Sequence, residues 1–171
     1  MLETNLDSID WKILAELQTN ARISNVDLAD RVNLSPSPCL ARVRALEREG
    51  IISRYVTLLD ARAVSLGVSL FVQVRLERQV EGALKTFEKA VVSRPEVMEC
   101  YLMTGLSDYL LRVVVSELDE FQRFVTDFLS KIPGVGSIQS SVALKQVKYQ
   151  TALPLPGDER RHAKTARRQP R

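Results

Sequence analysis

The sequence predicts an α+β fold, in which a helical N-terminal domain is followed by a ferredoxin-like βαββαβ domain. Apolar residues recur at helical spacing in the first fifty positions, whereas from residue 68 onward runs that alternate with period two are interspersed with further helical patterns. A chain of 171 residues is long enough for one domain or two small ones. We expect domains at 1–59 and 68–153, a linker at 60–67, and a basic, disordered tail at 154–171.

Three N-terminal helices follow from capping residues and apolar spacing. Asp7 can cap the first, Ser24 can begin the second, and Asn33 tolerates the left-handed backbone of a short turn. The third helix is expected over 36–49, with prolines in its first turn and a glycine after its end. Together they form a winged-helix-like helix-turn-helix unit, and a strand is predicted to follow over 51–59.

The second domain is predicted from changes in the spacing of its apolar residues. We expect strands and helices in the order strand 69–77, helix 80–91, strand 97–103, strand 108–115, helix 118–132 and strand 136–149. This order corresponds to an antiparallel sheet with two helices on one face. Residues 113–115 are apolar on both faces of their strand, so the open face needs cover, which a second subunit supplies most simply.

The residue inventory argues against most enzyme classes. His162 is the only histidine and lies in the basic tail, so no histidine-based triad can be assembled. One histidine with Cys39 and Cys100 cannot close a four-ligand zinc site, and no glycine-rich phosphate loop occurs. We therefore expect no catalytic residues, no metal and no cofactor. The chain also lacks an apolar run that could span a membrane or serve as a signal core, which favours the cytoplasm.

The positive charge is concentrated at the C-terminal end. Residues 154–171 carry a net charge of +4, so the other 153 residues carry −1. A nucleic-acid interface must therefore depend on local charge within the folded domains. The tail itself is expected to add salt-sensitive attraction to DNA that does not depend on sequence.

The third helix has the pattern of a helix that enters the major groove of double-stranded DNA. Small residues lie at its N-terminal end and four arginines follow, whereas only two glutamates oppose them. Arg42 can reach base edges or phosphates, and the later arginines are better placed for phosphates. The expected DNA-binding residues are Ser35, Ser37, Pro38, Ala41, Arg42, Arg44, Arg48 and Arg54. The alternative is an ordinary solvated helix face.

The turn over 104–109 has two interpretations. It can be a simple strand connection that uses the backbone freedom of Gly105. It can also bind a small zwitterion such as an amino acid, because backbone N–H groups suit a carboxylate and Asp108 suits an ammonium group.

Two motifs resemble one family. Residues 34–47, Leu-Ser-Pro-Ser-Pro-Cys-Leu-Ala-Arg-Val-Arg-Ala-Leu-Glu, look like the DNA-binding domain of the Lrp/AsnC (feast/famine) transcriptional regulators. Residues 105–111, Gly-Leu-Ser-Asp-Tyr-Leu-Leu, resemble their ligand-sensing and dimer-forming domain. The resemblance covers roughly 6–153. Residues 95–101 and 143–149 are similar to the subgroup that controls branched-chain keto-acid dehydrogenase operons, with the proline-catabolism and cysteine-responsive subgroups left open.

The resemblance implies a sequence-specific, nucleoid-associated regulator of amino-acid metabolism genes. Such proteins are homodimers, often four dimers forming an octamer, and bind an amino-acid effector between dimers; the subgroup suggests a branched-chain one. The implied effector-binding residues are Thr104, Gly105, Leu106, Ser107, Asp108, Tyr109, Leu118, Ser140, Ser141, Val142 and Ala143. Leu106 stands where the family usually has an acid, which favours an aliphatic ligand or a filled pocket. The alternatives are an effector-independent architectural protein that wraps DNA and, more remotely, a small-molecule enzyme.

Overall fold

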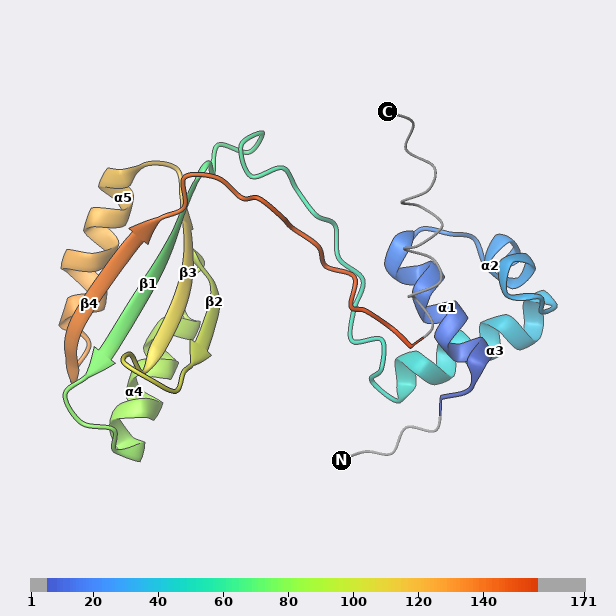
Figure 1. Cartoon of the computed structure of the whole chain (residues 1–171), viewed down its shortest axis with the longest axis horizontal. Coiled ribbons are helices and arrows are strands. Elements are labelled where there is room, and N and C mark those ends of the chain that lie inside the picture. Colours follow the sequence, from blue (N-terminus) through green and yellow to red (C-terminus); the bar gives the residue numbers. More distant parts are fainter. Residues whose placement is uncertain (1–5, 157–171) are drawn as a thin grey trace. The chain divides into compact units, whose positions relative to one another are not determined.

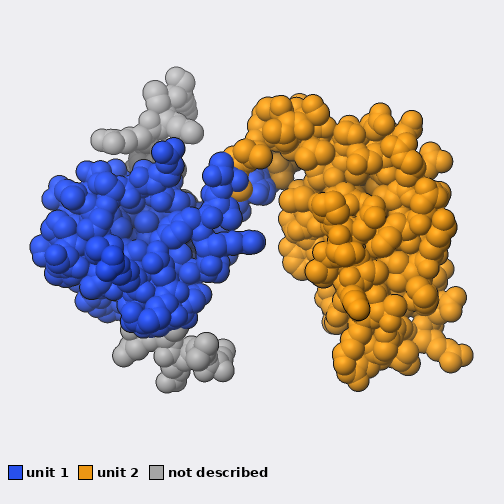
Figure 2. All heavy atoms as spheres, turned by 180° about the vertical axis from the view of Figure 1, so that it is seen from behind, with its two compact units in different colours: residues 1–57, 148–171 blue, residues 58–147 orange. Residues whose placement is uncertain are grey.

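The computed structural model describes residues 6–156, in two compact units that Figure 2 distinguishes by colour. One unit comprises residues 1–57 with 148–171, and the other comprises 58–147. This division differs from the expected boundaries, because 148–153 group with the helical unit rather than with the sheet. The expected disordered tail lies, from residue 157 on, outside the described residues.

The helical unit has the three expected helices, α1 (Ser8–Thr19), α2 (Asn25–Val32) and α3 (Pro36–Arg48). The Asp7 carboxylate caps α1 by accepting hydrogen bonds from the first turn, and Asp10 completes a capping box. Asn33 ends α2 in the left-handed conformation with φ 58°. The caps predicted from the sequence are confirmed.

The core of this unit is formed by side chains from all three helices. Its buried members are Ile13, Leu14, Leu28, Ala29, Val32, Cys39 and Leu46. The predicted strand over 51–59 is wrong, because no residue from 51 to 59 lies in a strand. Instead, the amides of Ile51 and Ile52 both donate to the carbonyl of Leu46, and both side chains pack on the core. The chain after α3 is therefore used to close the helix end.

The second unit has the predicted βαββαβ order. Its elements are β1 (Val68–Leu76), α4 (Glu81–Val92), β2 (Val97–Leu102), β3 (Tyr109–Val115), α5 (Leu118–Arg123) with its continuation, and β4 (Val135–Val142). The strands form one antiparallel sheet in the order β2-β3-β1-β4. Both helices lie on one face of this sheet (Figure 1).

The covered face of the sheet holds the main core. Alternate residues of β1, such as Leu70, Val72 and Val74, are fully buried there with Phe87 of α4. On the open face, Phe71 is 42 % exposed within the single chain. Among the described residues of this unit, no helix covers that face of the sheet.

Two elements end or change differently from expectation. The second predicted helix contains a π-helical segment over Phe124–Phe128 and ends in a 3₁₀ turn, Leu129–Lys131. The last strand stops at Val142 rather than at residue 149. Because β1 begins at Val68 and the amide of Ala143 donates to the carbonyl of Ser69, residues 144–149 have no partner strand among the described residues.

Candidate DNA interface and effector site

Most of the residues expected to bind DNA are at the surface of the helical unit. Ser35 precedes α3 as its N-cap, but its side chain makes no capping hydrogen bond, so the hydroxyl remains available to solvent. Those that are exposed are Ser35, Ser37, Pro38, Ala41, Arg44, Arg48 and Arg54. Arg42 differs, since it is half-buried.

Arg42 joins α3 to the start of α1. Its Nη1 donates to Asp7 Oδ2 at 2.7 Å and to Asp10 Oδ1 at 2.8 Å. The backbone amide of Asp10 and this guanidinium lower the pKa of the Asp7 carboxyl from its ordinary value. Both hydrogen bonds come from Nη1 of Arg42. The guanidinium therefore links α3 to α1 through this one nitrogen.

The first turn of α3 is held by Asn25, which the sequence analysis did not identify. Asn25, at the start of α2, donates from Nδ2 to the carbonyl oxygen of Pro36 at 2.8 Å. Its Oδ1 is buried and has no hydrogen-bond partner among the described residues. This contact ties the first turn of α2 to the first turn of α3. Nothing in the local sequence distinguishes Asn25 from an ordinary residue after an N-cap.

Two arginines of α3, Arg44 and Arg48, and Arg54 after it differ from the paired cations of this unit. Arg31 is bound to Glu16 at 2.9 Å, whereas no ion pair is recorded for Arg44, Arg48 or Arg54 within the described part of the chain. Unpaired guanidinium groups can take phosphate oxygens without first breaking an internal contact.

The segment after α3 is fixed by a tyrosine. The hydroxyl of Tyr55 donates to Glu47 Oε1 at 2.8 Å. Burial and the adjacent Glu47 carboxylate raise the pKa of Tyr55 to about 12. Because Arg54 directly precedes this anchored residue, its backbone is held beside the end of α3.

In the second unit, the glycine turn between β2 and β3 has an exposed tip and a buried end. Thr104, Gly105 and Leu106 are exposed, and Leu106 reaches 95 % exposure. Gly105 has φ +121°, a conformation that residues with a Cβ rarely adopt. The tip therefore presents accessible backbone groups and one apolar side chain to solvent.

Asp108 ends this turn in a different environment. Its side chain is buried, and Oδ2 accepts the backbone N–H of Leu76 at 2.6 Å while Oδ1 accepts from the Gln79 side chain. Leu76 follows a register shift in the pairing of β1 with β4. The carboxylate thus fixes the end of β1, and both of its oxygens are engaged in the fold.

Tyr109 is also part of the core. Its ring stacks on Phe87 with centroids 4.4 Å apart, and its hydroxyl donates to Glu88 Oε1 at 2.8 Å. Burial and the Glu88 carboxylate raise the pKa of the phenol above its ordinary value. Tyr109 therefore anchors the C-terminal end of the turn in the core.

The expected effector residues fall into two groups that the single chain does not bring together. The turn adjoins the C-terminal end of β1, because Tyr109 pairs with Val74 and the amide of Asp108 donates to the carbonyl of Val74. Ser141 instead pairs with Phe71, toward the opposite end of β1. Leu118 follows β3 at that opposite end too, and is 54 % exposed.

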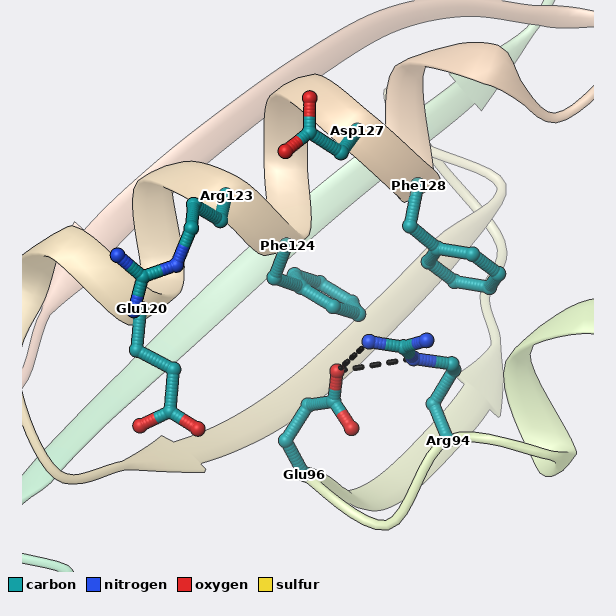
Figure 3. Close-up of a pocket in the computed structure, with 7 residues that line it drawn as sticks. All are labelled: Arg94, Glu96, Glu120, Arg123, Phe124, Asp127 and Phe128. Atoms are coloured by element: carbon teal, nitrogen blue, oxygen red, sulfur yellow. Dashed lines mark hydrogen bonds and ion pairs between the residues drawn. The ribbon is translucent and has the colours of Figure 1, made fainter.

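A pocket that sequence reasoning did not foresee lies beside α5 and its π-helical continuation. The cavity has a volume of about 390 Å³. Charged and aromatic side chains line it (Figure 3). The Arg94 guanidinium stacks 4.6 Å from the Phe128 ring centroid and binds Glu96. None of the expected effector residues lines it. The residues that line it come from two separate segments, 94–96 and 120–128, so no local sequence motif predicts the pocket.

Among positions 6–156, no group of three or more His, Cys, Asp or Glu side chains could hold a metal ion. Over the same range, no helix has the length and apolar character needed to cross a lipid bilayer.

Comparison with known proteins agrees with this geometry. Residues 6–53 match a winged helix-turn-helix DNA-binding model, and residues 69–153 match the Lrp/AsnC ligand-binding domain. The chain belongs to the Lrp/AsnC family. It is therefore a transcriptional regulator with a helix-turn-helix DNA-binding domain, and not an enzyme.

Several members of the family are similar along most of their length. The Bkd operon transcriptional regulator of Pseudomonas aeruginosa is 48 % identical over 150 residues, which are 88 % of this chain and 98 % of the relative. The leucine-responsive regulatory protein of Escherichia coli is 40 % identical, covering 87 % and 91 % of the two chains. A transcriptional regulator of Neisseria meningitidis, solved as an L-Met complex, has a TM-score of 0.83 at 44 % identity, covering 87 % and 96 %.

Proposed function

We propose that this Lrp/AsnC regulator is an amino-acid-responsive homo-oligomer that reads paired half-sites on double-stranded DNA and controls genes of amino-acid metabolism. The observation that carries the proposal is the exposed face of α3, where small residues precede the unpaired Arg44 and Arg48. The relatives named for the Bkd operon and for leucine support a branched-chain amino acid as effector.

A dimer is supported by the open face of the sheet. Cross-strand pairing puts Phe71 on this face with Leu110, Tyr101 and Val114, since β1 and β3 bury their alternate residues beneath the helices. A second copy of the same face would cover these apolar groups. Two-fold symmetry then requires half-sites about 34 Å apart along the duplex, or a multiple of this.

The effector site supports assembly beyond one chain. The glycine turn and the Ser140–Ala143 group adjoin opposite ends of β1, so a ligand that touches both needs turn and strand end from different subunits. In our proposal, the exposed backbone at Gly105 and Leu106 takes the ligand, whereas Asp108 positions the turn. Such an interface accommodates four dimers in an octamer, whose place of action is the bacterial nucleoid in the cytoplasm.

The DNA part of the proposal is tested with two arginine variants. We expect Arg42→Ala to abolish the preference for an operator fragment over a random duplex, because Arg42 is the arginine proposed to reach base edges. Arg48→Ala should weaken binding to both duplexes about equally, since a phosphate contact carries no sequence information. Equal losses on both duplexes for both variants would contradict this division.

The effector part is tested by thermal unfolding in the presence of single amino acids. A ligand that binds only the folded protein raises its melting temperature, and we expect branched-chain amino acids to give the largest rise. Their effect should be reciprocal, so that the same amino acids change the affinity for operator DNA. If no amino acid shifts the melting temperature, the effector-independent architectural role replaces the responsive one.

A further inference from the structure

The start of α3 lacks the capping bond that usually fixes a helix N-terminus. Ser35 is the N-cap, and an N-cap hydroxyl normally accepts the N–H of the second or third helical residue. The third helical residue here is Pro38, which has no N–H, and the Ser35 side chain makes no capping hydrogen bond. The first turn of α3 therefore depends on other elements for its position.

That support comes from α2. Asn25 is the first residue of α2, and its Nδ2 donates to the carbonyl oxygen of Pro36 at 2.8 Å. The turn between the two helices is fixed separately, because the amide of Leu34 donates to the carbonyl of Ala29 at 2.9 Å. The turn fixes the place where α3 begins. A second fixed point, away from the turn, restricts the angle between α2 and α3.

The other polar atom of the Asn25 amide indicates that stability does not explain this residue. Its Oδ1 is buried and has no hydrogen-bond partner among the described residues. Burying an unpaired acceptor costs at least as much free energy as one neutral hydrogen bond returns. An apolar side chain of similar shape would avoid this penalty. It would not supply a direction, because a hydrogen bond depends on angle whereas apolar contact does not.

We propose that Asn25 is a positioning residue for sequence reading, which sets the angle of α3 so that its N-terminal residues meet the base edges of the duplex. This role rests on the proposed DNA-binding function of α3. Asn25 does not contact DNA in this assignment. It acts through Pro36, which belongs to the same helical turn as Ser37 and Pro38.

A change in the angle of α3 affects base contacts more than phosphate contacts. A short side chain such as that of Ser37 reaches a base edge only within hydrogen-bond distance, so a shift of about 1 Å in the first turn breaks the contact. Arg44 and Arg48 have long side chains that can follow the phosphates after the same shift. Loss of the Asn25 contact should therefore reduce sequence preference and leave sequence-independent binding unchanged.

The experiment uses the full-length chain and an operator duplex that the native protein selects from a random-sequence pool. Asn25→Leu keeps the branching of the side chain and removes both the donor and the unpaired acceptor. We expect the ratio of its affinities for operator and random duplex to fall about tenfold. Its melting temperature should be unchanged or higher, because the buried unpaired acceptor is gone. Its salt slope on the random duplex should match that of the native protein.

A second variant and a matched control isolate the contact. Asn25→Asp keeps the size of the side chain but places a carboxylate oxygen against the carbonyl of Pro36, and it should show the same loss of preference. Asn20→Leu is the control, because the Oδ1 of Asn20 accepts the amide of Arg22 at 3.0 Å, away from α3. The affinity ratio of this control should equal that of the native protein.

Three results distinguish the positioning role from the proposed function. A native protein that selects no preferred duplex would contradict the proposed function itself. If both Asn25 variants are folded by circular dichroism and prefer the operator as strongly as the native protein does, the positioning role is overturned. Equal losses of affinity for both duplexes, together with a lower melting temperature, would assign Asn25 a purely structural role and overturn it as well.

Discussion

Nη1 of Arg42 lies 2.8 Å from Oδ1 of Asp10, so the helix proposed to read DNA is joined to the first helix of the domain by an ion pair. The Asp10 side chain is only 14 % exposed and that of Arg42 34 %, so the contact is partly shielded from water. A shielded charged hydrogen bond contributes more than a fully exposed one.

The first prediction concerns this pair. In urea unfolding, we expect Arg42→Ala and Asp10→Asn each to lower the free energy of unfolding, with a coupling energy of about 1 kcal/mol in the double-mutant cycle. Arg44→Ala, on the exposed face of the same helix, is the control and should change stability by less than about 0.5 kcal/mol. A coupling energy near zero would show that the contact does not hold the helices together.

The second prediction is a pH dependence at Asp7. The amide of Asp10 and the Arg42 guanidinium lower the pKa of this carboxyl below its ordinary 3.8. A lowered pKa in the folded state stabilises the protein above the ordinary value, and this contribution disappears as the pH falls through the lowered pKa. The melting temperature of native protein should exceed that of Asp7→Asn at pH 7, and the gap should close below about pH 3.8. A gap that persists or widens in acid would contradict this assignment.

The third prediction concerns the buried carboxylate of Asp108. Asp108→Ala leaves the N–H of Leu76 without its acceptor, and we expect a loss of about 2 to 3 kcal/mol in the free energy of unfolding. Asp127→Ala, an exposed acid of the same unit with a 3.7 Å ion pair, should cost less than about 0.5 kcal/mol. If the two variants are equally stable, the Asp108 carboxylate is not needed for the fold.

The fourth prediction separates ligand binding from folding at Leu106. Because this side chain is 95 % exposed in the single chain, Leu106→Ala should leave the free energy of unfolding of the effector-free protein unchanged. It should weaken an aliphatic effector about tenfold in titration calorimetry, since the lost methylene groups no longer contact the ligand. Unaltered effector affinity would exclude Leu106 from the site.

Much of the fold could be predicted because its signals are local. The caps at Asp7, Ser24 and Asn33 act within three residues of the helix ends, and the alternation along β1 is visible in nine consecutive residues. The strand expected over 51–59 failed because a β-branched run fits a strand locally, whereas Ile51 and Ile52 found partners at the end of α3.

The candidate site divides in the same way. Exposure of the α3 face was predicted from the helical period, and the structure agrees except at Arg42 and Ala45, which are both half-buried. The sequence presented Asp108 as an accessible acid in a turn, and it did not identify Asn25 at all. Both depend on partners that lie eleven or more residues away in the sequence.

By itself, the sequence determined the three helices, the βαββαβ order and the basic face of α3, because caps and apolar periods act between near neighbours. Only the tertiary structure decided what individual polar groups do. Arg42 meets Asp10 across 32 positions, and Gln18 meets Leu153 across 135. Contacts of that separation depend on how the packed core brings distant segments together, and no local pattern records them.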